Sequence, residues 1–175
     1  SFDMLGEAAH TAADAAKYFK DYETAITEIA RAASAPRPVD NPGISVKLSA
    51  LHPRYDYAKR KRVLEELGAS VRALAIQAKE ANIGFNIDAE EAARLDLSLD
   101  LIEALMRDPK LGGWDGFGVV VQAYQRRAPF VIDWLAVMAR ETGRRIMVRL
   151  VKGAYWDGEI KRAQVMGLES YPVFT

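Results

Sequence analysis

The sequence has 175 residues, which is enough for one domain with a hydrophobic core. Its 24 basic and 24 acidic residues cancel, so the charge favours neither nucleic acid nor an anionic membrane surface as a partner. The absence of cysteine excludes disulfides and thiolate metal sites, and no apolar run approaches the roughly 20 residues of a membrane-spanning helix.

Helices and strands are predicted to alternate along the chain. Residues 1–7 are interpreted as the tail of a strand that runs into a turn at Gly6. Apolar periodicity then predicts helices at 11–33, 57–82, 97–106, 130–141 and 157–166, and strands at 44–48, 84–88, 118–122 and 146–151. Thr11 with Asp14 predicts a capping box, and Gly143 suits the C-terminal cap of a helix.

The alternation predicts the α/β class, with a parallel sheet built from βαβ units. The strands lack a strict alternation of apolar and polar residues, as expected when both faces of the sheet are covered. No clear strand is followed by Gly-x-Gly-x-x-Gly, which favours a (βα)8 barrel over an open dinucleotide-binding sheet. Because such a barrel usually takes ~250 residues, only its first five strands are expected here.

Polar side chains stand where the predicted strands end. Lys47, Asp88 and Gln122 each follow or close an apolar run, and Arg149 and Lys152 lie at the end of the next strand. The carboxyl ends of parallel strands share one rim, where barrels and open sheets bind their ligands. We therefore expect these side chains to meet in one pocket.

Two other charged patterns have simpler interpretations. Glu90 and Glu91 are placed at the start of a loop or helix, where carboxylates suit the helix dipole, and no metal site is expected. The basic run at 59–62 is followed by Glu65 and Glu66, which indicates a solvated helix face rather than a nucleic-acid contact.

Several blocks of the sequence resemble one protein family in order and spacing. They include Asp-Met-Leu-Gly-Glu at 3–7, Ile-Ser-Val-Lys-Leu-Ser-Ala-Leu-His-Pro-Arg-Tyr at 44–55, Asn-Ile-Asp-Ala-Glu-Glu at 86–91, Val-Gln-Ala-Tyr-Gln at 121–125 and Arg-Leu-Val-Lys-Gly-Ala-Tyr-Trp at 149–156. The family is the proline dehydrogenase domain of the bacterial bifunctional proline-utilization A flavoproteins. The resemblance runs from Ser1 to Thr175.

The resemblance implies a distorted TIM-like barrel that binds FAD and oxidises L-proline to Δ1-pyrroline-5-carboxylate, the first step from proline to glutamate. Hydride would pass to flavin N5 and electrons to a membrane quinone. It also implies an aldehyde dehydrogenase domain in the same polypeptide and a cytoplasmic location. Peripheral attachment at the inner membrane and a homo-oligomer are options that it leaves open.

By this resemblance, residues 1–175 run from the end of strand one through strand five and its following helix. Strands six to eight and the last helix would lie outside this sequence. In the family, the last helix carries two arginines that clamp the proline carboxylate. A threonine-histidine segment on strand six also helps to hold the FAD.

Site roles follow from the same resemblance. Lys47 corresponds to a lysine that faces the substrate carboxylate, Asp88 to an aspartate that shapes the pocket, and Arg149 to an arginine near flavin N5. Gln122 corresponds to a glutamine at the flavin ring. The resemblance also implies that Val151, Gly153, Ala154 and Trp156 bind the cofactor. Tyr155 and Glu7 would bind the substrate, with Glu7 as a gate residue that pairs with an arginine.

Other functions stay open from the sequence. Lys47 could instead be the Schiff-base lysine of a barrel aldolase or lyase, or a lysine at a strand end that reaches solvent. Arg149 could form a salt bridge to a carboxylate such as Asp88, either in place of a flavin contact or in addition to it. An inactive half-barrel used for interaction is a third, non-enzymatic alternative.

Overall fold

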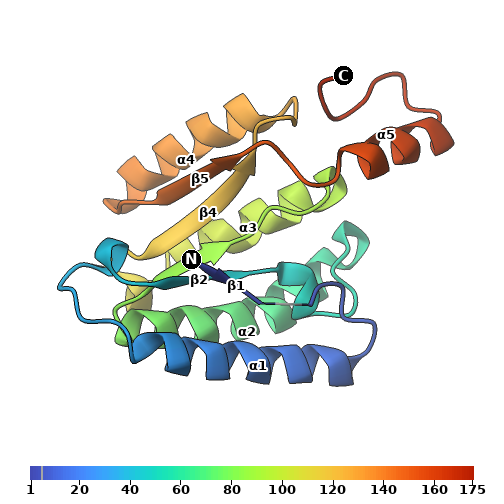
Figure 1. The fold of residues 1–175 in the computed structure, drawn as a ribbon. Coiled ribbons are helices and arrows are strands. Elements are labelled where there is room, and N and C mark those ends of the chain that lie inside the picture. Colours follow the sequence, from blue (N-terminus) through green and yellow to red (C-terminus); the bar gives the residue numbers. More distant parts are fainter. Residues whose placement is uncertain (5) are drawn as a thin grey trace.

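The computed structural model describes residues 1–4 and 6–175, and it shows five parallel strands flanked by helices (Figure 1). Neighbouring strands follow the sequence order β1-β2-β3-β4-β5, and every pairing is parallel. The strands are β1 Phe2–Asp3, β2 Gly43–Val46, β3 Gly84–Ile87, β4 Phe117–Gln122 and β5 Met147–Val151. The helices are α1 Ala12–Ala30, α2 Arg60–Glu80, α3 Leu95–Met106, α4 Ala128–Thr142 and α5 Trp156–Val165. The predicted α/β class and parallel sheet are confirmed.

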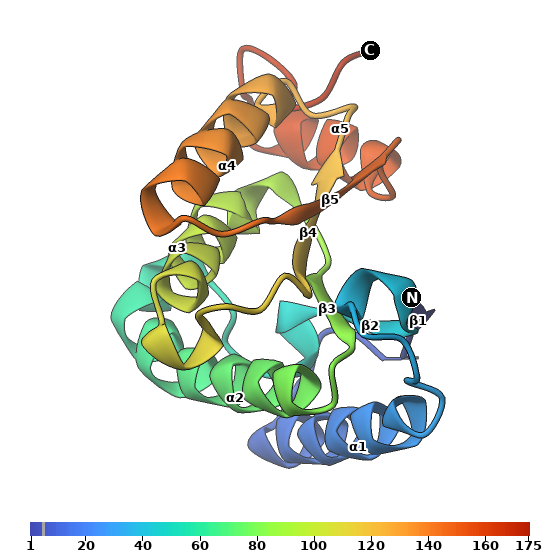
Figure 2. The same cartoon turned by 90° about the vertical axis from the view of Figure 1, so that its left-hand side faces the viewer.

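Helices α1 to α4 form an arc around the outside of the curved sheet (Figure 2). Both predicted helix caps are present. Thr11 Oγ1 accepts from the Asp14 N–H at 3.1 Å, and Asp14 Oδ2 accepts from the Thr11 N–H at 2.9 Å. Gly143 ends α4 with a φ of 62°, a left-handed conformation that glycine adopts without a Cβ clash.

Two predicted boundaries were wrong for one physical reason. The strand predicted at 44–48 ends two residues early, because Leu48–Ala50 form a short 3-10 helix. The helix predicted at 57–82 begins three residues late, because Tyr57–Lys59 also form a 3-10 helix. Both turns lie beyond the carboxyl end of β2, where local hydrogen bonds replace the sheet or helix ladder.

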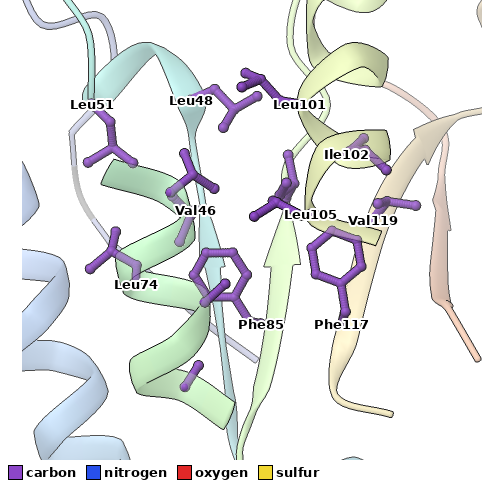
Figure 3. Close-up of a cluster of buried hydrophobic side chains, with 14 of the residues drawn as sticks. Val46, Leu48, Leu51, Leu74, Phe85, Leu101, Ile102, Leu105, Phe117 and Val119 are labelled. Atoms are coloured by element: carbon purple, nitrogen blue, oxygen red, sulfur yellow. The ribbon is translucent and has the colours of Figure 1, made fainter. Parts of the chain in front are cut away.

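The hydrophobic core lies between the outer face of the sheet and the helices. Figure 3 shows side chains from three strands interleaved with those of α2 and α3. The labelled core residues are Val46, Leu48, Leu51, Leu74, Phe85, Leu101, Ile102, Leu105, Phe117 and Val119. Because these apolar residues alternate along each strand, the intervening polar ones face the inside of the curve.

One layer of that inner face is closely packed. Ser45 pairs with Asn86, Asn86 with Gly118, and Gly118 with Met147 across four strands. A Cβ added at Gly118 would overlap the Asn86 side-chain oxygen and lie 3.0 Å from the Met147 carbonyl oxygen. Glycine at 118 therefore makes room for the larger side chains on either side.

We predict that Gly118→Ala destabilises the protein by about 1–3 kcal/mol, because Asn86 and the backbone of β5 must shift. Gly158→Ala is the matched control, since nothing lies within 4 Å of its added Cβ inside α5. That control should be neutral or stabilising by up to about 1 kcal/mol. Thermal unfolding of the purified variants measures both effects, and equal changes at the two positions would contradict this packing.

Strand β5 is an open edge of the sheet among the described residues. Val148 and Leu150 on its outer face are 46% and 59% exposed. No helix in the described part of the chain is long and apolar enough to cross a bilayer. Closure of the sheet into a full barrel by three further strands stays a prediction.

Candidate functional site

The carboxyl end of the sheet brings together four charged side chains, which we call the rim cluster: Asp3, Lys47, Asp88 and Arg149. Asp88 lies between the two cations. Its Oδ2 is 3.0 Å from Lys47 Nζ, and its Oδ1 is 2.6 Å from Arg149 Nη2. The sequence placed Lys47, Asp88, Gln122, Arg149 and Lys152 at one rim, and the structure brings Lys47, Asp88 and Arg149 into contact. Gln122 and Lys152 are not part of this cluster.

Asp88 is the buried centre of the rim cluster, with a side chain that is 8% exposed. The salt bridge to Arg149, left open by the sequence, is present, and Arg149 Nη2 also approaches Ser45 Oγ at 3.4 Å. Both carboxylate oxygens of Asp88 accept hydrogen bonds from cations. Its geometry suits holding Lys47 and Arg149 in position.

Lys47 has two carboxylate partners. Its Nζ lies 3.1 and 3.3 Å from the Asp3 oxygens, in addition to the contact with Asp88. Partial burial alone would lower the pKa of Lys47, but the hydrogen bonds and charges of Asp88 and Asp3 outweigh it and raise that pKa. The side chain is therefore an ammonium group at neutral pH.

The protonated state of Lys47 argues against the aldolase alternative, because a Schiff base forms from the neutral amine. We predict that borohydride, added with pyruvate as a carbonyl probe at pH 7, leaves Lys47 unmodified. Mass spectrometry of the peptide that contains Lys47 measures this directly, with the Lys47→Arg variant as the blank. An adduct on Lys47 would restore the aldolase alternative.

Gln122 is buried and connects two loops of the rim. Its Nε2 donates to the Glu90 carbonyl oxygen at 2.8 Å, and its Oε1 accepts from the Ala154 N–H at 3.0 Å. An amide can donate and accept once more at each end, so each end of the Gln122 side chain keeps hydrogen-bonding capacity. Contact between Gln122 and a flavin ring stays a prediction.

The segment after β5 follows the rim. Gly153 has a φ of 130°, and a Cβ there would overlap the Tyr124 ring. The Tyr124 hydroxyl accepts from the Tyr155 N–H at 3.0 Å, and Trp156 Nε1 donates to the Phe174 carbonyl oxygen at 2.9 Å. These contacts fix the turn that leads from β5 into α5.

A cavity of about 400 Å³ opens beside this segment, a size within the usual range for ligand pockets. Three aromatic rings, one lysine and one aspartate contribute to its lining. It is lined by Tyr124, Lys152, Gly153, Ala154, Trp156, Asp157 and Phe174. Of the predicted cofactor positions, Gly153, Ala154 and Trp156 belong to this lining, and Gln122, Arg149 and Val151 lie outside it.

Besides Lys47, the predicted substrate positions are Tyr155 and Glu7. Burial raises the pKa of the Tyr155 hydroxyl, and the carboxylates of Glu90 and Glu7 raise it further. Glu7 is exposed in the loop before α1. Its pairing with an arginine outside this sequence stays a prediction.

Glu90 lies in the loop that leads from β3 into a 3-10 helix, as the sequence predicted. Its side chain, however, is buried and hydrogen-bonded rather than exposed at a helix end. Its Oε1 accepts from the Ser49 N–H at 3.0 Å, and its Oε2 accepts from Arg94 Nη1 at 2.8 Å. The spacing of four residues between Glu90 and Arg94 is the sequence signal that could have predicted their ion pair.

Sequence reasoning also missed Asp3 and Tyr22. Asp3 lies in a strand of two residues, which is too short for any pattern. Tyr22 is buried in α1, and its hydroxyl accepts from the Lys47 N–H at 3.1 Å. Within the described residues, no three metal-ligating side chains come together in a way that could hold a metal ion.

A proline dehydrogenase family model matches residues 1–175. The bifunctional protein PutA of Klebsiella aerogenes is 58% identical over 175 residues, and that of Rhizobium meliloti is 60% identical over 178 residues. Each match covers all of this chain but only 13% and 14% of the relative, respectively.

Two solved structures are also similar. One is proline utilization A (PutA) of Bradyrhizobium japonicum, mutant D779Y, with a TM-score of 0.98, 59% identity, and coverage of 100% of this chain and 18% of that chain. The other is PutA of Bdellovibrio bacteriovorus inactivated by N-propargylglycine, with a TM-score of 0.90, 29% identity, and coverage of 99% and 19%.

Proposed function

The chain belongs to the proline dehydrogenase family, and from this premise we propose that it forms part of an FAD-dependent domain that oxidises L-proline to Δ1-pyrroline-5-carboxylate. The observation that carries the proposal is the rim cluster, in which Lys47 and Arg149 share the buried Asp88 at the carboxyl end of a parallel sheet. Ligand sites of barrel folds lie at this end.

The residues present fit a flavin cofactor in two respects. The cavity beside Gly153 has aromatic walls, which suit a ligand with ring systems, and Lys152 and Asp157 add one charge of each sign to its lining. Arg149 is half-exposed on the inner face, with a side-chain exposure of 44%, so part of its guanidinium is available to a ligand. When bound, FAD supplies the hydride acceptor, its N5 atom.

Arg149 would stabilise the negative charge that develops on the cofactor. A fixed cation that is already oriented lowers the barrier without reorganising during the reaction. Asp88 provides that orientation, since it binds Arg149 through one oxygen and Lys47 through the other. We assign Asp88 this positioning role rather than proton removal.

Lys47 would orient proline through the substrate carboxylate. The rim cluster has two carboxylates and two cations, so its formal charges sum to zero. A neutral cluster attracts an anion only weakly, because the charge of Lys47 is already offset by Asp3 and Asp88. We therefore propose that residues outside this chain supply further positive charge to the proline carboxylate.

The chain spans 13% of the length of the Klebsiella relative, which is named as bifunctional. We propose that it likewise belongs to a longer polypeptide that includes an aldehyde dehydrogenase domain. A membrane quinone would accept the electrons, with the protein in the cytoplasm or at the inner membrane surface.

The decisive experiment is anaerobic addition of L-proline to the purified full-length protein, followed by absorbance. The proposal predicts a yellow protein whose flavin band bleaches with L-proline, while D-proline serves as the stereochemical control. A protein that binds no FAD favours the interaction-fragment alternative. A flavoprotein that L-proline leaves oxidised would refute the proposed substrate.

A further inference from the structure

The loop between β1 and α1 carries the exposed Glu7 between two fixed points. Before it, Gly6 has a φ of 122° and lies so close to the Tyr18 ring of α1 that an added Cβ would overlap the ring. After it, the N–H of Ala8 donates to Ser49 Oγ at 3.0 Å. The loop is thus held on both sides of Glu7.

Ser49 holds this loop through two groups. Its carbonyl oxygen accepts from the Ala9 N–H at 2.9 Å, in addition to the bond from Ala8 to its hydroxyl oxygen. Ala8 has a φ of 53°, which is a costly conformation for a residue with a side chain. Such a conformation persists only where the surrounding contacts fix it, and here Ser49 provides them.

Glu90 in turn orients Ser49. The Ser49 N–H donates to Glu90 Oε1 at 3.0 Å, and both groups are buried. Arg94 holds the other Glu90 oxygen at 2.8 Å. The carboxylate therefore fixes the backbone of Ser49, whose hydroxyl oxygen accepts from the Ala8 N–H.

We propose that Ser49, oriented by the buried Glu90, is a positioning residue that fixes the loop of residues 6–9 and so places Glu7 at the rim of the site. The inference rests on the proposed function for the role of that rim. Two observations place the loop there. It follows Asp3, which contacts Lys47, and it bonds to Ser49, which lies two residues after Lys47.

The first test is Ser49→Ala in the full-length protein, measured by amide hydrogen exchange. The variant removes the hydroxyl but keeps the Ser49 backbone, so exchange at Ala8 should accelerate about tenfold while the rest of the sheet is unchanged. Ser70→Ala is the matched control, because the Ser70 hydroxyl bonds only to the Glu66 carbonyl oxygen of its own helix. Unchanged exchange at Ala8 would overturn the proposal.

The second test separates positioning from a general effect on structure. Ser49→Ala should raise KM for L-proline about fivefold and keep kcat and FAD content within about twofold, because the rim cluster itself is intact. Ser49→Thr retains the hydroxyl and should restore the wild-type KM. Faster exchange at Ala8 with an unchanged KM would overturn the placement of Glu7.

A third variant keeps the test decisive if Ser49→Ala does not fold. Glu90→Gln retains an acceptor for the Ser49 N–H but loses the charge, and it should give the same pattern with smaller changes. If the wild-type protein is not reduced by L-proline, the proposed function fails. The exchange of Ala8 then still decides whether Ser49 and Glu90 anchor the loop.

Discussion

Replacing Asp88 by Asn should lower kcat/KM for L-proline about 100-fold in the full-length protein. The substitution keeps the shape of the side chain but removes the charge shared by Lys47 and Arg149. Loss of one partner from a buried, hydrogen-bonded charge pair costs about 2–5 kcal/mol, and each 1.4 kcal/mol corresponds to about tenfold in rate. Steady-state kinetics measures the change.

Asp133→Asn is the control for this prediction. Asp133 is exposed on α4 and forms no ion pair among the described residues, so the same chemical change there should leave kcat/KM within about twofold. A small effect at Asp88, comparable to that at Asp133, would mean that the two cations do not depend on Asp88 for their positions.

Replacing Arg149 by Ala should slow flavin reduction by L-proline about 100- to 1,000-fold and weaken FAD retention. A preorganised donor beside developing negative charge is typically worth this much in rate. Arg149→Lys keeps the charge but loses the planar guanidinium, which can donate to Asp88 and to a ligand at the same time. We therefore expect an intermediate rate of flavin reduction. Stopped-flow absorbance gives the reduction rate, and the spectrum after gel filtration gives the FAD content.

Arg145→Ala provides the control at the opposite end of the same strand. Arg145 is exposed and precedes the amino end of β5, whereas the rim cluster lies at the carboxyl end of the sheet. Its loss should therefore change neither flavin reduction nor FAD content. If Arg149→Ala reduces its flavin at the wild-type rate and retains its FAD, Arg149 has only a structural role.

The convergence at the rim was predictable because it depends on local patterns alone. Alternating helices and strands predict parallel pairing, and parallel pairing places the ends of β2, β3 and β5 along the same edge of the sheet. Lys47, Asp88 and Arg149 could therefore be assigned to one site before their distances were known. The capping residues Thr11 and Gly143 were predictable for a similar reason, since each acts within one turn of its own helix.

The supporting contacts were not predictable, because they join residues far apart in the chain through single hydrogen bonds. Glu90 bonds Ser49 across 41 positions, and the Tyr22 hydroxyl bonds the Lys47 N–H across 25. Side chains that bond to a backbone group leave no periodic pattern in the sequence. The 3-10 helix after Lys47 had no Pro or Gly signal either, so the end of β2 was misplaced.

A double-mutant cycle between Lys47→Ala and Arg149→Ala, measured on kcat/KM for L-proline, tests most directly whether these residues act as one site. Because both bind the same Asp88 carboxylate, their effects should be non-additive, with a coupling energy of at least about 1 kcal/mol. The pair Lys47→Ala and Arg145→Ala should be additive. Additivity within about 0.5 kcal/mol for Lys47 and Arg149 as well would contradict a single rim site.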